Sequence, residues 1–226
     1  MTDITQQKQA AGIYAANLVE DNTIVGLGTG STVKFFVEAL AQRIKDENLN
    51  IVGVTTSNRT TELATKLGIQ IKKVDEVEYI DLTIDGADEV DPDLNGIKGG
   101  GAALLFEKIV ATNSKQNYWI VDESKLSEKL GINFKLPVEV VKYGAQLVFN
   151  KLEKDGYKPV WRMTNSQKLE TDSNNYIIDI DVSQIQDFAK LANDLKMMTG
   201  VVEHGLFLNI AQMIIVGGQE IRTINK

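Results

Sequence analysis

The chain has 226 residues, no cysteine, one histidine and a formal net charge of -7. This composition excludes disulfides, thiolate catalysis and zinc sites built from cysteines or histidine clusters, and the acidic balance does not suit nucleic-acid binding. The apolar run 207–216 is interrupted by Asn209 and Gln212 and is too short to span a bilayer, and the opening residues are too polar for a secretory signal. We therefore expect a cytoplasmic protein with no nucleic-acid or membrane partner.

Strands and helices alternate in the first half of the chain. The predicted strands are residues 23–27, 51–55, 79–84 and 118–121. The predicted helices are one over about 33–44, one that ends at Gly68, and one over about 101–112. This alternation predicts a parallel sheet that is covered by helices.

A polar segment directly follows each of these strands. The segments are GTGST (28–32), TTSN (55–58), DGADE (85–89) and DESK (122–125). Ligands of open α/β sheets bind outside the carboxyl ends of the strands. The four segments are therefore expected to line one crevice.

The second half has a different pattern. Its predicted order is a strand at 138–141, a helix at 145–153, strands at 159–163 and 176–181, a helix at 185–195 and a strand at 200–203. The order β-α-β-β-α-β is typical of a ferredoxin-like unit. We predict an α/β fold with a Rossmann-like parallel-sheet domain, residues 1–131 plus 206–226, and a smaller ferredoxin-like α+β domain, residues 132–205.

The segment GLGTGST places backbone amides, the hydroxyls of Ser31 and Thr32 and a helix N-terminus where a phosphate could bind. An ordinary capped turn explains the same residues equally well. The segment lacks the Gly-Lys-Ser/Thr of a P-loop, and Ser31 stands where a dinucleotide fingerprint requires its third glycine. A single sugar phosphate therefore fits better than a nucleotide.

The segment DGADEVD alternates acids with small residues, but Pro92 and Leu94 break the pattern of a calcium loop. We interpret Asp85 and Asp88 as groups that handle protons or bind hydroxyls at a strand end. A solvated acidic turn is the alternative.

The segment IKGGGAALLFEK gives the sharpest signal. If a helix begins at Gly101, the amides of Gly99 to Gly101 form a cradle for a negative charge. The predicted helix is apolar on nearly every side, so Glu107 should be buried, and burial raises a carboxyl pKa toward the range of a general base. The alternative is a surface pair of Glu107 with Lys108.

Other conspicuous residues have ordinary explanations. Lys8 and Lys125 are by themselves unremarkable surface lysines, and His204 is expected to be structural or exposed near the domain junction. Trp119 and Trp161 lie in predicted strands and are expected in the core.

Taken in order, GLGTGST, TTSN, DGADEVD, IKGGGAALLFEK, VDESK and LPVEV resemble the A-type ribose-5-phosphate isomerases, nearly from end to end. The resemblance implies interconversion of D-ribose 5-phosphate and D-ribulose 5-phosphate through a cis-enediolate, in the non-oxidative pentose phosphate pathway, without metal or organic cofactor. It also implies a homodimer or homotetramer whose small-molecule partner is a sugar phosphate.

The resemblance assigns roles to individual positions. Glu107 is implied as the proton acceptor, with Asp85, Asp88 and Lys98 as further catalytic groups and Asp85 implicated in opening the furanose ring. The implied substrate-binding residues are Lys8, Thr29, Gly30, Ser31, Thr32, Asp85, Gly86, Ala87, Asp88, Lys98, Gly99, Gly100, Gly101 and Lys125.

Two other functions share parts of this pattern. Amino-sugar phosphate isomerase/deaminases and coenzyme A transferases belong to the same broad fold group, but we do not find this ordered set of loops in them. A non-catalytic sugar-phosphate sensor is the other alternative. It would be expected to carry a DNA-binding helix-turn-helix, whereas here the α/β pattern begins by Thr23, after one helix.

Overall fold

A computed structural model describes residues 3–226 and divides them into two compact units. The sheet unit contains the residues up to Ala87, together with Phe106–Leu126 and Asn209–Lys226. The small unit contains Asp88–Leu105 and Ser127–Leu208. Each unit has a sheet and a hydrophobic core of its own.

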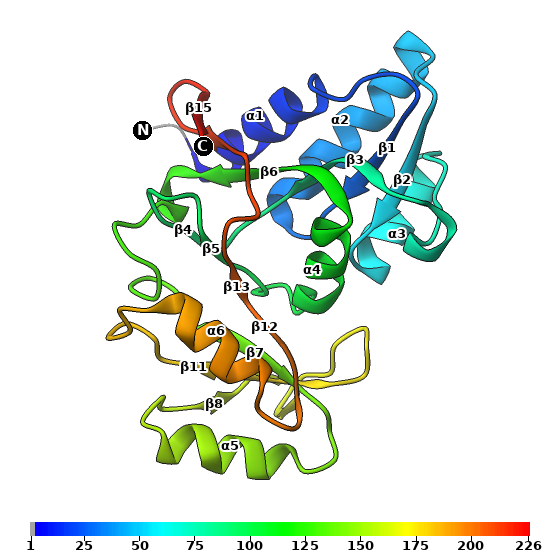
Figure 1. Cartoon of the computed structure of the whole chain (residues 1–226). Coiled ribbons are helices and arrows are strands. Elements are labelled where there is room, and N and C mark those ends of the chain that lie inside the picture. Colours follow the sequence, from blue (N-terminus) through cyan, green and yellow to red (C-terminus); the bar gives the residue numbers. More distant parts are fainter. Residues whose placement is uncertain (1–2) are drawn as a thin grey trace. The chain divides into compact units, whose positions relative to one another are not determined.

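The sheet unit is built on six strands in the order β15-β14-β6-β3-β1-β2 (Figure 1). The strands are β1 (Thr23–Leu27), β2 (Ile51–Thr55), β3 (Ile80–Asp85), β6 (Ser114–Asp122), β14 (Met213–Gly217) and β15 (Arg222–Asn225). Neighbours pair in parallel except β15, which runs antiparallel to β14. Strand β2 pairs with one edge of β1, and β3 pairs with the other edge. The order of strands therefore reverses between β1 and β3, which is the switch point of the sheet.

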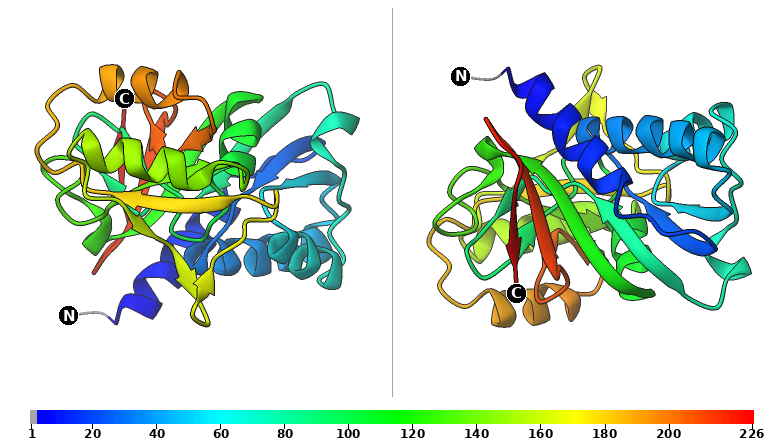
Figure 2. Two further views of the ribbon diagram at one scale, coloured as in Figure 1. Left: turned by 90° about the horizontal axis from the view of Figure 1, so that it is seen from below. Right: turned by 90° about the horizontal axis from the view of Figure 1, so that it is seen from above.

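Helices cover both faces of this sheet. They are α1 (Ile4–Ala16), α2 (Ser31–Glu47), α3 (Asn58–Lys66) and α4 (Leu104–Thr112), with the short helices η1 (Val74–Glu76) and η2 (Glu123–Lys125). Helices α1 and α2 lie side by side over one face, where Val25 joins their core cluster (Figure 2). Ile24, the residue before Val25 in β1, instead packs with Val110 of α4. Successive side chains of a strand point to opposite faces, so α4 lies on the other face.

The small unit has a four-stranded antiparallel sheet in the order β12-β7-β11-β8. Its elements are β7 (Leu136–Val140), α5 (Ala145–Lys154), β8 (Val160–Trp161), β11 (Tyr176–Ile180), α6 (Phe188–Lys196) and β12 (Val201–His204), with a hairpin of β9 (Met163–Thr164) and β10 (Gln167–Lys168). The order of elements confirms the ferredoxin-like prediction. Leu136, Val138 and Val140 of β7 face a core that includes Val148 of α5 and Leu191 of α6.

A second, three-stranded sheet completes the small unit. Its strands are β4 (Glu89–Val90), β5 (Gly96–Ile97) and β13 (Leu206–Phe207), in the order β13-β5-β4. None of these three strands was predicted, because runs of two residues are too short for an alternating pattern. Strand β15 was not predicted either, because it is polar and mostly exposed at the sheet edge.

The start of α4 corrects one prediction. The helix begins at Leu104 and not at Gly101. Ala102 has a φ of 63°, which is left-handed and cannot continue a right-handed helix, and its amide donates to the oxygen of Gly99 at 3.0 Å. Residues 99–102 therefore form a turn, which we call the glycine turn.

The domain boundaries 1–131 plus 206–226 and 132–205 remain a prediction. In the structure, residues 88–105 pack with the small unit because β5 pairs with β13. None of the helices within residues 3–226 has the length and apolar character that crossing a membrane requires.

Candidate active site

The candidate site residues form two groups, one in each unit. In the sheet unit, β1 and β3 end side by side, and polar loops begin at Gly28 and Gly86. The carboxylate of Asp85, whose exposed fraction is 2%, accepts the amides of Thr29 at 2.9 Å and of Gly86 at 2.7 Å. A side chain at Gly28 would collide with this carboxylate, because an added Cβ would lie 2.1 Å from Oδ1. Asp85 thus connects two of the predicted loops.

The TTSN segment is joined to the same loops by hydroxyl groups. The Thr29 hydroxyl lies 2.7 Å from that of Thr56 and donates to that of Ser57 at 2.8 Å. Thr60 donates to the carbonyl of Gly28 at 2.8 Å. These four side chains, which we call the threonine network, are buried. The hydroxyl of Thr29 therefore serves to fix the loop, and Thr56, Ser57 and Thr60 were not among the predicted site residues.

The exposed end of this loop is the start of α2. Gly30 is the N-cap and supplies no side chain, so the first-turn amides of α2 receive no cap from it. Lys8 of α1 donates to the Ser31 hydroxyl at 3.1 Å and lies 3.9 Å from the buried Asp122. Lysine, hydroxyl and helix N-terminus together suit an anion. Lys125, another predicted substrate-binding residue, is half-buried. It is the last residue of η2, the short helix that begins directly after Asp122.

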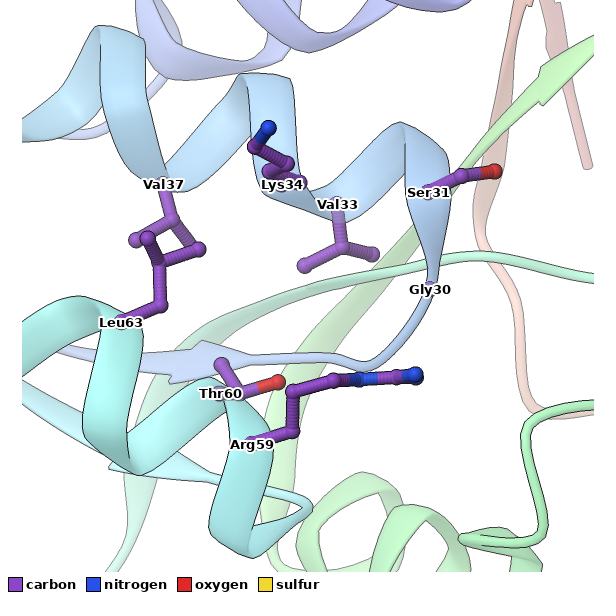
Figure 3. A pocket seen from close by; sticks show the side chains of 8 residues that line it. All are labelled: Gly30, Ser31, Val33, Lys34, Val37, Arg59, Thr60 and Leu63. Atoms are coloured by element: carbon purple, nitrogen blue, oxygen red, sulfur yellow. The ribbon is translucent and has the colours of Figure 1, made fainter.

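A cavity of about 340 Å³ opens beside this loop, between α2 and α3 (Figure 3). Gly30 and Ser31 form one end of its lining, and Arg59 and Lys34 add two cationic side chains. Figure 3 shows the Arg59 side chain extending toward Gly30. Arg59 was not among the predicted site residues, because it follows TTSN directly and belongs to no recognisable motif.

In the small unit, Asp88 holds the glycine turn. The amide of Gly100 donates to the Asp88 carboxylate at 2.6 Å, and a Cβ at Gly100 would lie 2.4 Å from that carboxylate. Only glycine can approach so closely. The Gly100 amide is therefore already bonded, which corrects the expectation of three unpaired donors at Gly99 to Gly101.

Two buried charged side chains flank the glycine turn in the sequence. Lys98, with an exposed fraction of 2%, has its ammonium 5.2 Å from the centre of the Phe207 ring. Its backbone amide donates to the carbonyl of Gly205 at 2.9 Å. Glu107 lies in the first turn of α4 with an exposed fraction of 4%, so the prediction that it is buried is confirmed.

The other acids of DGADEVD have structural partners. Buried Glu89 accepts the amides of Gly131 at 2.7 Å and Asn133 at 2.9 Å. Asp91 accepts the amides of Asp93 and Asn95 and closes a turn. The segment is therefore not a solvated acidic turn. His204 is buried, and its Nδ1 accepts the amide of Leu206, which is a structural contact.

The comparison with known families is decisive. Residues 52–221 match the sequence pattern of ribose 5-phosphate isomerase A (phosphoriboisomerase A). The chain belongs to this family. It is 57% identical over 213 residues to ribose-5-phosphate isomerase A of Streptococcus suis strain 05ZYH33, with 94% of the chain and 95% of that protein covered. Against the enzyme of Streptococcus thermophilus strain CNRZ 1066 the identity is 56% over 214 residues, with 94% of each covered.

Solved structures of the family agree with the fold. The isomerase A from Methanocaldococcus jannaschii has a TM-score of 0.94 at 36% identity, covering 99% of this chain and all of that chain. A D-ribose-5-phosphate isomerase in complex with phospho-erythronic acid has a TM-score of 0.96 at 35% identity, with both chains covered completely. The predicted family and fold class are confirmed, and the chain is an isomerase. The roles of individual site residues remain proposals.

Proposed function

We propose that the chain interconverts D-ribose 5-phosphate and D-ribulose 5-phosphate through a cis-enediolate. The observation that carries the proposal is that two charged side chains, Lys98 and Glu107, which flank the glycine turn in the sequence, are both buried. A buried carboxylate and a buried ammonium in a member of this family suit proton transfer next to a carbonyl.

Glu107 is the proposed base. Its carboxylate removes the proton from C2 of the open-chain aldose, and the electron pair of that bond forms the C1–C2 double bond while negative charge moves to the carbonyl oxygen. The same carboxyl then returns the proton to C1, while the hydroxyl on C2 loses its proton and becomes the new carbonyl. That proton passes to the negatively charged oxygen on C1, which becomes a hydroxyl. One carboxylate suffices because both carbons present the same face in a cis-enediolate.

The negative charge requires donors that are already in place. We assign this role to Lys98 and to the backbone of the glycine turn, with Asp88 at its edge. Fixed donors of this kind act mainly in the transition state, since the charge develops there. Asp85, which is held between the loops after β1 and β3, is the proposed group for opening the furanose ring.

The phosphate end of the substrate is assigned to the loop after β1. The amides and hydroxyls of Gly30 to Thr32, together with Lys8, provide the anion site, and Lys125 adds a second cation. The solved relative bound to phospho-erythronic acid supports the proposed class of substrate by the chemistry of its ligand. That ligand carries a phosphate at one end and a planar carboxylate, which resembles an enediolate, at the other.

The direct test is an isomerase assay on the purified chain. D-Ribose 5-phosphate, phosphate-free ribose, glucosamine 6-phosphate and an acyl-coenzyme A are compared side by side. We expect turnover of ribose 5-phosphate alone, unchanged by chelator. Tight binding of ribose 5-phosphate without turnover would indicate a sensor, and turnover of another substrate would indicate a different member of the fold group.

We also propose a cytoplasmic homo-oligomer, either a dimer or a tetramer. Tyr143, Leu147 and Met197 of the small unit are strongly exposed and line one apolar depression. Exposed apolar patches are typical of protein interfaces. Light scattering on the wild type and on Leu147→Glu measures the mass of the assembly, and a monomeric wild type would contradict this part of the proposal.

A further inference from the structure

Arg162 of the small unit contacts the glycine turn. It lies between β8 and β9, in a segment that was not predicted to contribute to the site. Its backbone amide donates to the carbonyl of Ile177 at 3.0 Å, and its carbonyl accepts the amide of Leu169 at 2.8 Å. The backbone of Arg162 is thus fixed from both sides.

The guanidinium is fixed as well. Its Nε donates to Oδ2 of Asp179 at 2.9 Å, and its Nη2 donates to Oδ1 of the same carboxylate. Asp179 lies in β11 between Ile178 and Ile180, which both face the core, so its side chain points to the opposite face of the sheet. The two side chains are only 14% and 18% exposed. A two-pronged pair of this kind sets the orientation of the arginine.

The remaining nitrogen reaches the glycine turn. Nη1 of Arg162 donates to the carbonyl oxygen of Gly99 and, at 3.3 Å, to that of Gly100. In a trans peptide the carbonyl and the following amide point in opposite directions, and no described peptide bond is cis. Holding these two oxygens therefore directs the amides of Gly100 and Gly101 away from Arg162. The Gly100 amide indeed points at Asp88.

We propose that Arg162, oriented by Asp179, is a positioning residue that fixes the Gly100 and Gly101 amides and, through Gly100, the carboxylate of Asp88. This inference rests on the proposed isomerase function. Three successive glycines form the least restrained backbone that a protein can have. Groups that face an enediolate must be aligned before the charge appears, and Arg162 supplies this alignment for the Gly101 amide and the Asp88 carboxylate, which the glycines alone do not fix.

The role predicts a loss of turnover without a loss of substrate binding. In Arg162→Met we expect kcat to fall about 10- to 100-fold, below the effect of deleting an oxyanion donor outright, with KM changed less than about threefold. Arg162→Lys should be intermediate, because one ammonium cannot hold the carboxylate and both carbonyls. Asp179→Asn should lower kcat in the same direction by a smaller factor.

Lys158→Met is the matched control. Lys158 is a cation of the same unit, and its ammonium pairs with Asp181 at 3.1 Å instead of with the glycine turn. In Lys158→Met, kcat and KM should stay within about twofold of the wild-type values, as for most surface changes.

A second measurement separates positioning from general support of the fold. Calorimetry compares the binding of phospho-erythronic acid, which probes both ends of the site, with that of inorganic phosphate, which probes one. Phospho-erythronic acid should bind more weakly to Arg162→Met than to the wild type, while the Kd of inorganic phosphate stays within about twofold of the wild-type value. An equal weakening of both ligands would overturn the positioning role.

The outcomes also distinguish this inference from the proposed function. If the wild type turns over ribose 5-phosphate and Arg162→Met matches its kcat, the inference alone fails. If the wild type shows no turnover, the proposed function fails. Should Arg162→Met not fold, Arg162→Lys and Asp179→Asn provide the test, and wild-type kcat in both would refute the proposal.

Discussion

The loops of the sheet unit and the glycine turn of the small unit are held in place by different means. The sheet-unit loops are fixed by near neighbours at the ends of β1, β2 and β3, through the Asp85 carboxylate and the threonine network. The glycine turn has almost no side chains of its own. It is fixed by Asp88 on one side and by Arg162 on the other.

The two regions suit different parts of the proposed substrate. The rigid hydroxyl-lined loops suit the phosphate, whose charge does not change during the reaction. The glycine turn and Lys98 suit the enediolate, whose charge exists only near the transition state. Changes in the sheet-unit anion site should therefore raise KM, whereas changes at the donors or the base should lower kcat.

The largest effect is expected for the base. Glu107→Gln should lower kcat by about 10³-fold or more, because an amide cannot accept the C2 proton. Steady-state assays on ribose 5-phosphate measure it, with circular dichroism to verify the fold. Glu62→Gln, an exposed change on α3, is the control. Wild-type turnover in Glu107→Gln would remove this residue from its role.

The second-largest loss of kcat is expected for Lys98→Met. Removing the buried ammonium takes away one donor to the developing charge and should lower kcat by about 10²- to 10³-fold with a small change in KM. The methionine can occupy the apolar site beside Phe207, so the fold should persist. A rise in KM with unchanged kcat would place Lys98 among the groups that only bind substrate.

Lys8→Met tests the proposed anion site of the sheet unit. It removes the cation beside Ser31, and we expect KM to rise about 10-fold, a loss of about 1.4 kcal/mol, while kcat changes little. Lys45→Met, in the last turn of α2, is the control. The division of labour between the two groups is wrong if Lys8→Met reduces kcat instead.

The smallest effect concerns a carboxylate close to Asp179 that makes no contact with the turn. Hydrogen bonds from the side chain and amide of Ser183, and from Lys158, lower the pKa of Asp181 to about 2. A depressed pKa stabilises the folded state above pH 4, and this contribution disappears as the pH falls from about 4 to 2. The side chain is 28% exposed, so solvent screening limits the effect to about 1 kcal/mol.

Urea unfolding of the wild type and Asp181→Asn at pH 7 and pH 3 measures this contribution. The stability difference should shrink at the lower pH, while kcat at pH 7 stays within about twofold. A lowered kcat in Asp181→Asn would show that the turn responds to charges on this edge of the small unit in general and not to the Arg162–Asp179 pair.

The same difference explains what could be predicted from the sequence. The sheet-unit loops could be found because each follows an apolar strand directly, so local pattern and sheet topology together bring them to one edge. Burial of Glu107 followed from the apolar sequence of α4. These features depend on residues that lie close together in the chain.

The arrangement of the glycine turn could not be predicted in the same way. Arg162 lies 63 residues beyond Gly99, in a polar segment with no periodicity, and its contact depends on the register of β11 against β8. The start of α4 was misplaced for a similar reason, since the left-handed Ala102 has no signal in the sequence. Roles that depend on distant pairing become visible only in the folded chain.

The most direct test of the account is deuterium exchange at C2 of ribose 5-phosphate in D2O, followed by NMR, for the wild type and Glu107→Gln. We expect the wild type to introduce deuterium at C2 during turnover and Glu107→Gln to introduce essentially none, although this variant still binds phospho-erythronic acid. Exchange at the wild-type rate in Glu107→Gln would show that another group removes the proton and that Glu107 is not the base.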